Sequence, residues 1–232
     1  MRGRADLRTR RSPRLIERAE KATALEEKLG GQLVGPARPH LNYWSFGERG
    51  LVNYAACDGH KLVAGWKEIR RLNPRLTVDI TTLRKQTMAT IAELVKLPLA
   101  EIYLVRIESG LTDRALAALA PGLHGVKHLS LAYNEITPGG LAKVAPHLQS
   151  LEFLCVAPPV SDRNSDATCN ALAEAIAAAP ELRGLKAVYF FRQGKPDAKH
   201  IALLRKLPNM KSVEVGFMPP FAEDVDRWTR GG

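Results

Sequence analysis

The strongest constraint on this fold is a phrase that recurs along the chain and is clearest in residues 126–137, VKHLSLAYNEIT. Counted from Val126, apolar residues stand at positions 1, 4 and 6, an Asn at position 9 and an aliphatic residue at position 11. The first six positions return in four other segments, which begin at Leu99, Leu151, Leu185 and Met210. Successive starts are 27, 25, 34 and 25 residues apart. A repeat of this length predicts a solenoid, in which each unit packs against its neighbours.

A stretch with helical apolar spacing follows each phrase, so the sequence predicts strands that alternate with helices. The predicted helices cover residues 87–97, 112–119, 138–148, 167–179 and 197–207. The longest spacing contains a polar insertion, residues 157–170, which predicts a loop with a helix N-cap at Ser165 or Asp166.

The strand register decides which side chains face the core, because side chains alternate across a strand. In the alternating segment 76–80, either Leu76 and Val78 or Val78 and Ile80 are the core pair. From Leu99 onward the repeat predicts one register, with positions 1, 4 and 6 in the core and positions 3, 5, 7 and 8 on the opposite face.

The sequence divides into four parts: a basic tail (1–18), a cap region (19–74), a repeat array of about six units (75–217) and a C-terminal cap or tail (218–232). The cap region does not fit the repeat, and solenoids need atypical end units to cover their apolar ends. Helical spacing predicts helices over residues 14–29 and 61–72. In the C-terminal part, Trp228 is a candidate to cover the last repeat.

The phrase from Leu129 to Leu141 resembles the leucine-rich repeat family, in its longer, helix-containing classes. The resemblance covers residues 75–217 and implies an α/β solenoid, a short horseshoe with a parallel concave sheet and convex helices. In that family the Asn of the phrase bonds the backbone of neighbouring loops. Only Asn134 occupies this position here; the other units have Ile107, Pro159, Gln193 and Met218.

The predicted concave positions gather aromatic and basic side chains, the residue types that most often anchor interfaces. The candidate partner-binding residues are Tyr103, Arg106, His128, Tyr133, Phe153, Tyr189, Phe191, Arg192 and Phe217. We therefore predict a protein–protein interaction module that binds a protein or peptide on this face, and expect truncation of its exposed rings to leave stability nearly unchanged. The alternative is that some rings pack on flanking loops or on the terminal caps.

The net charge of +10 is concentrated in the tail, where residues 1–18 carry seven Arg against Asp6 and Glu17. Such a tail predicts either a solvated extension or a binder of nucleic acid or another anionic surface, through phosphate neutralisation. The candidate residues for that alternative function are Arg2, Arg4, Arg8, Arg10, Arg11 and Arg14.

The sequence offers little for catalysis, and we expect neither enzymatic activity, nor a cofactor, nor a metal site. Cys57, Cys155 and Cys169 show no C-x-x-C spacing, which favours a reducing, cytoplasmic setting over a disulfide scaffold. His124 and His128 are four residues apart, but the repeat predicts a loop and a strand there rather than one helix face. No apolar run is long enough to predict a membrane span.

Overall fold

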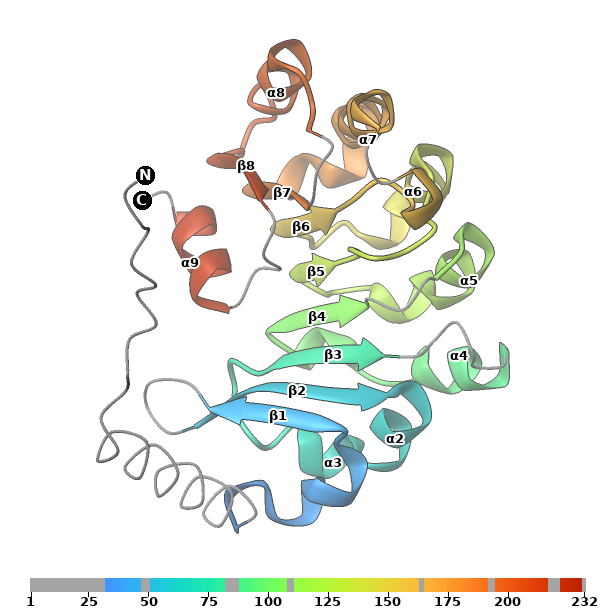
Figure 1. Ribbon diagram of the computed structural model, residues 1–232, viewed down its shortest axis with the longest axis vertical. Helices are drawn as coiled ribbons and strands as arrows, with labels where there is room; N and C mark the ends of the chain where they lie inside the picture. The colour runs from blue at the N-terminus through green and yellow to red at the C-terminus, as the bar shows by residue number, and fades with distance from the viewer. Residues whose placement is uncertain are drawn as a thin grey trace, which may run out of the picture.

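The chain forms one sheet of eight strands that lie side by side in sequence order (Figure 1). The computed structural model describes residues 32–46, 51–81, 88–107, 111–162, 165–191, 195–216 and 222–230. The first strand is antiparallel to the second, and each later pair is parallel. The fold is therefore α/β with one mostly parallel sheet, as predicted, and its sequential order is compatible with a solenoid.

Strands and helices alternate along the described residues. The strands are β1 (Tyr43–Phe46), β2 (Val52–Asp58), β3 (Thr77–Thr81), β4 (Leu104–Ile107), β5 (His128–Ser130), β6 (Phe153–Val156), β7 (Ala187–Phe191) and β8 (Ser212–Gly216). The α-helices are α2 (Gly59–Ala64), α3 (Trp66–Ile69), α4 (Met88–Leu94), α5 (Asp113–Leu119), α6 (Pro138–Val144), α7 (Asp166–Ala178), α8 (Ala198–Leu204) and α9 (Ala222–Arg230). Short 3₁₀ segments are η1 (Gly35–His40), η3 (Leu99–Glu101), η4 (Ala120–Leu123), η5 (Ala145–His147), η6 (Val160–Asp162) and η7 (Pro180–Gly184). All five helices predicted in the array are present.

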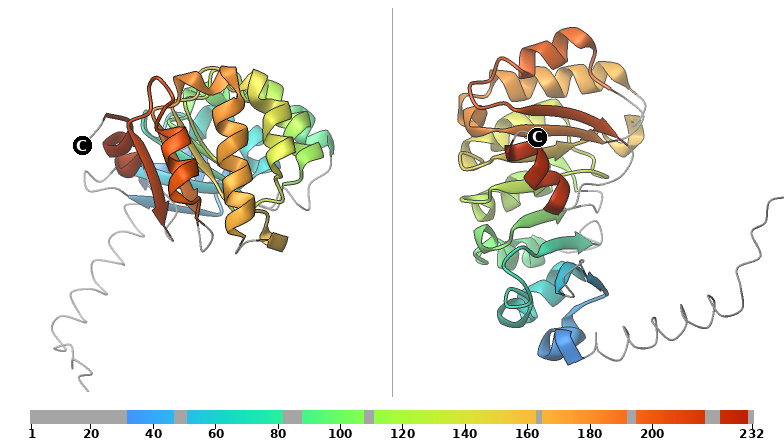
Figure 2. Two further views of the ribbon diagram at one scale, coloured as in Figure 1. Left: turned by 90° about the horizontal axis from the view of Figure 1, so that it is seen from above. Right: turned by 90° about the vertical axis from the view of Figure 1, so that its left-hand side faces the viewer.

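The main core lies between the sheet and the helices of the repeats. Leu129, Leu154 and Val188 occupy adjacent positions on neighbouring strands and are fully buried there. Helices α4 to α8 line this side of the sheet, whereas α9 lies on the opposite side (Figures 1 and 2). We call that opposite side the inner face; it is the face that the sequence predicts to be concave.

The register of β4 differs from the prediction by three residues. Val105 lies beside Leu129 and joins the main core, while Leu104 faces the inner side. Ile102 therefore begins this unit, and Leu99 belongs to η3. The prediction fails because β4 is buried on both faces, which removes the apolar–polar alternation that normally fixes register. In β3, the pair facing the main core is Val78 and Ile80, one of the two registers left open.

Asn134 ties the turn after β5 to the preceding repeat. Its side-chain oxygen accepts a hydrogen bond from the backbone N–H of Leu111 at 2.8 Å. Its amide nitrogen donates to the carbonyl oxygens of Ile107 and Leu131. The buried side chain thus satisfies backbone groups of two neighbouring loops, which otherwise would lose hydrogen bonds on burial.

Helices of the array begin at residues with short polar side chains, which satisfy backbone N–H groups of the first turn. Thr112, Thr137, Ser165 and Asp197 each accept a bond from the N–H three residues later. Ser165 was one of the two N-caps predicted for the insertion.

The sheet continues into the region predicted as a cap, because β2 pairs in parallel with β3. The single helix predicted over residues 61–72 is instead two short helices, α2 and α3, which meet at Gly65. A Cβ at Gly65 would lie 2.2 Å from the ring of His40, so η1 packs against bare backbone at this point. The basic tail and the helix predicted over residues 14–29 lie outside the described residues.

Candidate functional site: the inner face and the helix across it

A second apolar cluster, separate from the main core, lies between the inner face and α9. Its buried members are Leu104, Ala132, Phe153, Cys155, Ala157, Ala187, Tyr189, Phe191 and Val225. All but Val225 come from the strands β4, β6 and β7 or the segments that follow β5 and β6. The sheet is therefore covered on both faces over these strands.

Helix α9 presents one face to the sheet at regular helical spacing. Ala222, Val225 and Thr229 are buried, and Trp228 is partly buried. The Trp228 ring stacks on Tyr189 with 5.0 Å between ring centroids and an interplanar angle of 16°. It also stacks on Phe153 at 6.0 Å and 21°. The inner face thus binds a helix mainly through aromatic contact.

Three predicted partner-binding rings are the ones covered by this helix. Phe153, Tyr189 and Phe191 are 0%, 5% and 1% exposed, respectively. Tyr133 is half-buried and packs on Phe191 at 4.7 Å between centroids. These rings pack against the C-terminal part of the chain, which matches the alternative that some of them contact a terminal cap. Their burial contradicts the expectation that truncating them leaves stability nearly unchanged.

The sequence made Trp228 a candidate to cover the last repeat, as a terminal cap would. Its ring instead lies over β6 and β7, on Phe153 and Tyr189. The predicted site residues Arg192 and Phe217 lie outside the described residues.

Tyr103 links the sheet to α9 through its hydroxyl, which donates to the carboxylate of Asp226. The guanidinium of Arg75 lies over the Tyr103 ring, 5.0 Å from its centroid, and pairs with the same carboxylate. Arg230, one turn further along α9, approaches Asp226 at 3.7 Å. Asp226 therefore holds the helix on the sheet through ion pairs and a hydrogen bond, whereas Trp228 holds it through ring stacking. Burial raises the pKa of Tyr103.

His128 lies beside Tyr103, with 4.5 Å between the two ring centroids. Its Nδ1–H donates to the carbonyl oxygen of Tyr103 at 2.7 Å. Burial lowers the pKa of His128, which outweighs the opposing effects of this hydrogen bond and of Glu152. His128 is thus a neutral imidazole at pH 7, bonded to the backbone of the residue that precedes β4.

Arg106 is 4% exposed and belongs to a buried polar group on the inner face of β2, β3 and β4. It approaches Asp79 at 3.8 Å, and its guanidinium lies 5.4 Å from the Tyr54 ring centroid. The Tyr54 hydroxyl donates to Asp79 at 2.6 Å. Burial raises the pKa of Asp79, although Tyr54 and Arg106 both act to lower it. In this conformation Arg106 packs within the sheet rather than serving as the exposed anchor we predicted.

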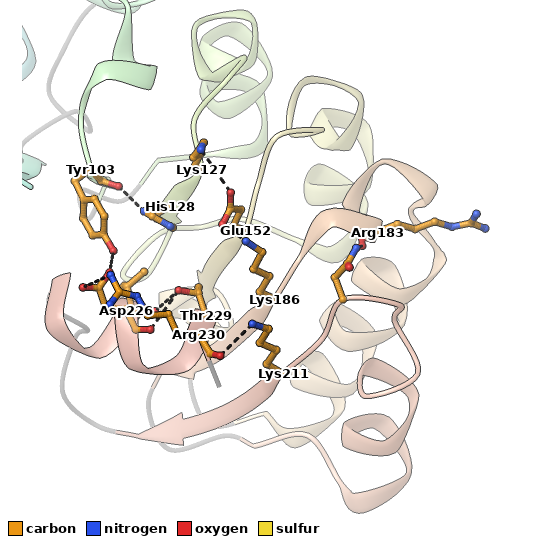
Figure 3. Close-up of polar contacts among 12 residues, drawn as sticks. Tyr103, Lys127, His128, Glu152, Arg183, Lys186, Lys211, Asp226, Thr229 and Arg230 are labelled. Carbon is orange, nitrogen blue, oxygen red and sulfur yellow. Dashed lines mark hydrogen bonds and ion pairs between the residues drawn. The ribbon is translucent and has the colours of Figure 1, made fainter. Parts of the chain in front are cut away.

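A row of charged side chains at the sheet edge escaped the sequence analysis. The residue immediately before each of the strands β5 to β8 is charged: Lys127, Glu152, Lys186 and Lys211. These residues line a cavity beside α9 (Figure 3). All four stand at position 2 of the repeat, so aligning the repeats on that position would have found them.

The other candidates behave as structural residues. Cys57, Cys155 and Cys169, all within the described residues, are buried thiols outside any disulfide. Burial raises the pKa of Cys57 and of Cys169 to about 12, which removes the thiolate that nucleophilic chemistry needs. Among the residues described by the structure, no three His, Cys, Asp or Glu side chains group as metal ligands. None of the described helices is long and apolar enough to cross a membrane.

Comparison with known proteins adds no relative from which a role could be transferred. No protein-family model matches the sequence, and no curated protein matches it. The function must therefore be argued from the site itself.

Proposed function

We propose that this protein is an interaction module of the leucine-rich repeat type that binds an amphipathic helix of a partner protein on its inner face. The observation that carries the proposal is α9, a helix held on that face by Trp228 and Asp226. Helix-in-groove recognition uses apolar anchors one turn apart, and α9 provides that pattern.

The leucine-rich repeat part of the proposal rests on three features of the chain. The units repeat at about 25 residues, each unit adds one parallel strand and a helix, and Asn134 bonds the backbone of a neighbouring loop. A curved array of this type presents its sheet face to partners.

We infer the chemistry of the partner helix from the geometry of α9. Val225 and Trp228, three residues apart, pack in the inner-face cluster, and Ala222, three residues before Val225, is buried as well. Asp226, next to Val225, meets Arg75 and Tyr103. A partner helix should therefore present small, aliphatic and aromatic side chains at this spacing, with a carboxylate next to the aliphatic residue.

Helix α9 is short enough for a partner helix to displace it from the inner face. It has nine residues, and isolated helices of fewer than about 12 residues are marginal in water. Its persistence depends on the inner face and on its attachment to the chain, which gives an effective concentration in the millimolar range. A longer partner helix that buries more apolar area would compete with it.

The test uses the full-length chain and a labelled peptide with the sequence of residues 218–232. We expect weak binding to the wild type, because its own helix occupies the face. Trp228→Ala weakens the resident helix, so this variant should bind the peptide saturably. Arg227→Ala, an exposed position on the same helix, is the matched control and should behave as the wild type.

A second peptide, with Ala in place of its Trp, should bind the Trp228→Ala protein at least tenfold more weakly, because it lacks the stacking partner of Tyr189. Equal binding of both peptides, or no saturable binding to any variant, would reject the inner face as a helix-binding surface.

Binding of nucleic acid or an anionic surface through the basic tail is the second candidate, favoured by the seven Arg in residues 1–18. Deleting residues 1–18 should leave helix binding intact. If the deletion instead abolishes a strongly salt-dependent association with nucleic acid, the tail has that second role.

A further inference from the structure

A cavity of about 600 Å³ lies between α9 and the amino ends of the parallel strands (Figure 3). Its sheet wall is formed by the residues that immediately precede β4 to β8: Tyr103, Lys127, Glu152, Lys186 and Lys211. Neighbouring strands are about 4.8 Å apart, so side chains from several repeats reach one bound group. Helix α9 closes the other side with Asp226, Thr229 and Arg230.

The charges around this cavity do not cancel. Four cationic side chains (Lys127, Lys186, Lys211 and Arg230) and three carboxylates (Glu101, Glu152 and Asp226) line the cavity, which leaves a surplus of one positive charge. Two of these carboxylates are also paired with arginines that do not line the cavity, Glu101 with Arg70 and Asp226 with Arg75, so the surplus over the whole group is three positive charges. The cavity is therefore suited to an anion with more than one negative charge.

The existing contacts leave the lysines able to bind a ligand. Glu152 is shared between Lys186, at 2.6 Å, and Lys127, at 3.6 Å. Partial burial favours the protonated form of Glu152, but its hydrogen bond with Lys186 and the nearby charges keep its pKa below the usual value. Lys211 donates one hydrogen bond to the carbonyl oxygen of Arg230 at 3.0 Å. Since each ammonium has three N–H groups, each lysine retains donors for an anion.

His128 lies beside the lysines in the wall of the cavity, where its ring can report on a bound group. It lines the cavity and is only 7% exposed, and its Nδ1 is bonded to the Tyr103 carbonyl. Figure 3 shows the other ring nitrogen on the side away from Tyr103. With Nδ1–H donating to that carbonyl, Nε2 of the neutral ring carries the lone pair, so it can accept a hydrogen bond but cannot donate one to an oxyanion. His128 would therefore be a neighbour of a bound anion rather than one of its hydrogen-bond donors.

We propose that this cavity binds a phosphate group, either free or as the head of a small organic phosphate ester, through Lys127, Lys186 and Lys211, with the His128 ring beside it. Lysines act as point charges around a tetrahedral oxyanion, and phosphate offers oxygens in several directions. The surplus of three positive charges favours a dianion over a singly charged carboxylate. Tyr103, whose ring borders the cavity, would lie beside the organic part of an ester.

The experiment follows the His128 ring resonance by NMR in the full-length protein, at constant ionic strength, with inorganic phosphate, phenyl phosphate and acetate as probes. The signal is assigned from its loss in His128→Gln. We expect a saturable shift with phosphate at a Kd of about 1 mM, and binding of acetate at least tenfold weaker. Tighter binding of phenyl phosphate identifies an ester as the ligand, whereas equal or weaker binding identifies free phosphate.

Charge variants test the assignment in both directions. Lys186→Gln and Lys211→Gln should each weaken phosphate binding about five- to tenfold, as expected for one nearby charge in a partly exposed site. Glu152→Gln should tighten binding by a similar factor, because it releases two lysines. Lys143→Gln, which removes an exposed charge from α6, is the control and should have no effect.

Thermal unfolding of each variant shows whether it is folded before it is scored. The proposal is wrong if phosphate produces no saturable shift in the wild type. It is also wrong if Glu152→Gln weakens binding, or if Lys143→Gln weakens it as much as Lys186→Gln, since the effect would then be general screening. These outcomes are distinct from those of the helix-binding test, whose variants change Trp228 and Arg227 rather than the charged residues of the cavity.

Discussion

The contact between Trp228 and the sheet yields the sharpest prediction about this molecule. Truncating a buried aromatic to Ala costs about 3–5 kcal/mol. Trp228 is only partly buried, so a cost of roughly 2–3 kcal/mol is expected. The stacked pairs with Tyr189 and Phe153, at about 0.5–1.5 kcal/mol each, account for much of that value.

This cost should appear as local undocking of α9 rather than as global unfolding. The repeats keep their main core on the other side of the sheet, and a nine-residue helix does not persist without its contacts. Amide hydrogen exchange measured by mass spectrometry reports this opening directly. Trp228→Ala should reduce the protection of α9 amides by roughly 30- to 150-fold, since 1.4 kcal/mol corresponds to tenfold.

The matched control is Arg227→Ala, which removes an exposed side chain that pairs with Asp224 at 3.8 Å. We expect its α9 protection to stay within about twofold of the wild type. Equal protection in Trp228→Ala and Arg227→Ala would refute the reasoning, because the ring stacking would then contribute nothing to docking. A loss of protection throughout the array would show that α9 is part of the global fold rather than a separable unit.

Three further predictions concern the fold. Asn134→Ala should lower the free energy of unfolding, measured with denaturant, by about 2–4 kcal/mol, because the Leu111 N–H and two carbonyl oxygens stay buried without their partner. A loss below about 0.5 kcal/mol would show that the turn does not need this side chain. Gly140→Ala should destabilise the protein by about 1–3 kcal/mol, because the new Cβ would lie 1.9 Å from the Asp113 oxygen that accepts a hydrogen bond from Thr137. Gly139→Ala is the control and should be neutral or stabilising, because the nearest atom to its Cβ would be 3.7 Å away. Equal effects at the two positions would contradict the close packing at Gly140. The carboxylates of Glu174 and Asp197, bonded to the His200 ring at 2.9 and 2.6 Å, raise the pKa of His200 above its ordinary value of 6.5. The protonated ring therefore stabilises the fold fully below pH 6.5, and this stabilisation is lost as the pH rises through the raised pKa. His200→Gln should therefore remove this component of the stability change between pH 6 and 8, and an NMR titration placing the His200 pKa at or below 6.5 would contradict it.

The sequence by itself determined the order of strands and helices in the array, from β3 to β8. Apolar residues at positions 4 and 6 appear in every unit from β5 onward, and the helices between them follow from apolar spacing and N-caps such as Thr137 and Ser165. These features are local, because each depends on residues within one repeat or its neighbour. The polar insertion was equally readable.

The register of β4 required the tertiary structure. Leu104 and Val105 are both apolar, and a strand buried on two faces gives no alternation to choose between them. Only the alignment of Val105 with Leu129 on the neighbouring strand decides which one enters the main core.

The tertiary structure also decided what covers the inner face. The pattern of α9 indicates that one side of the helix is buried, but a pattern does not identify the surface that buries it. Trp228 meets Tyr189 only because the chain returns across the sheet after β8, a contact that no local rule contains. The cavity depends on the same return, since Lys186 and Lys211 become one wall of a site only when α9 supplies the other.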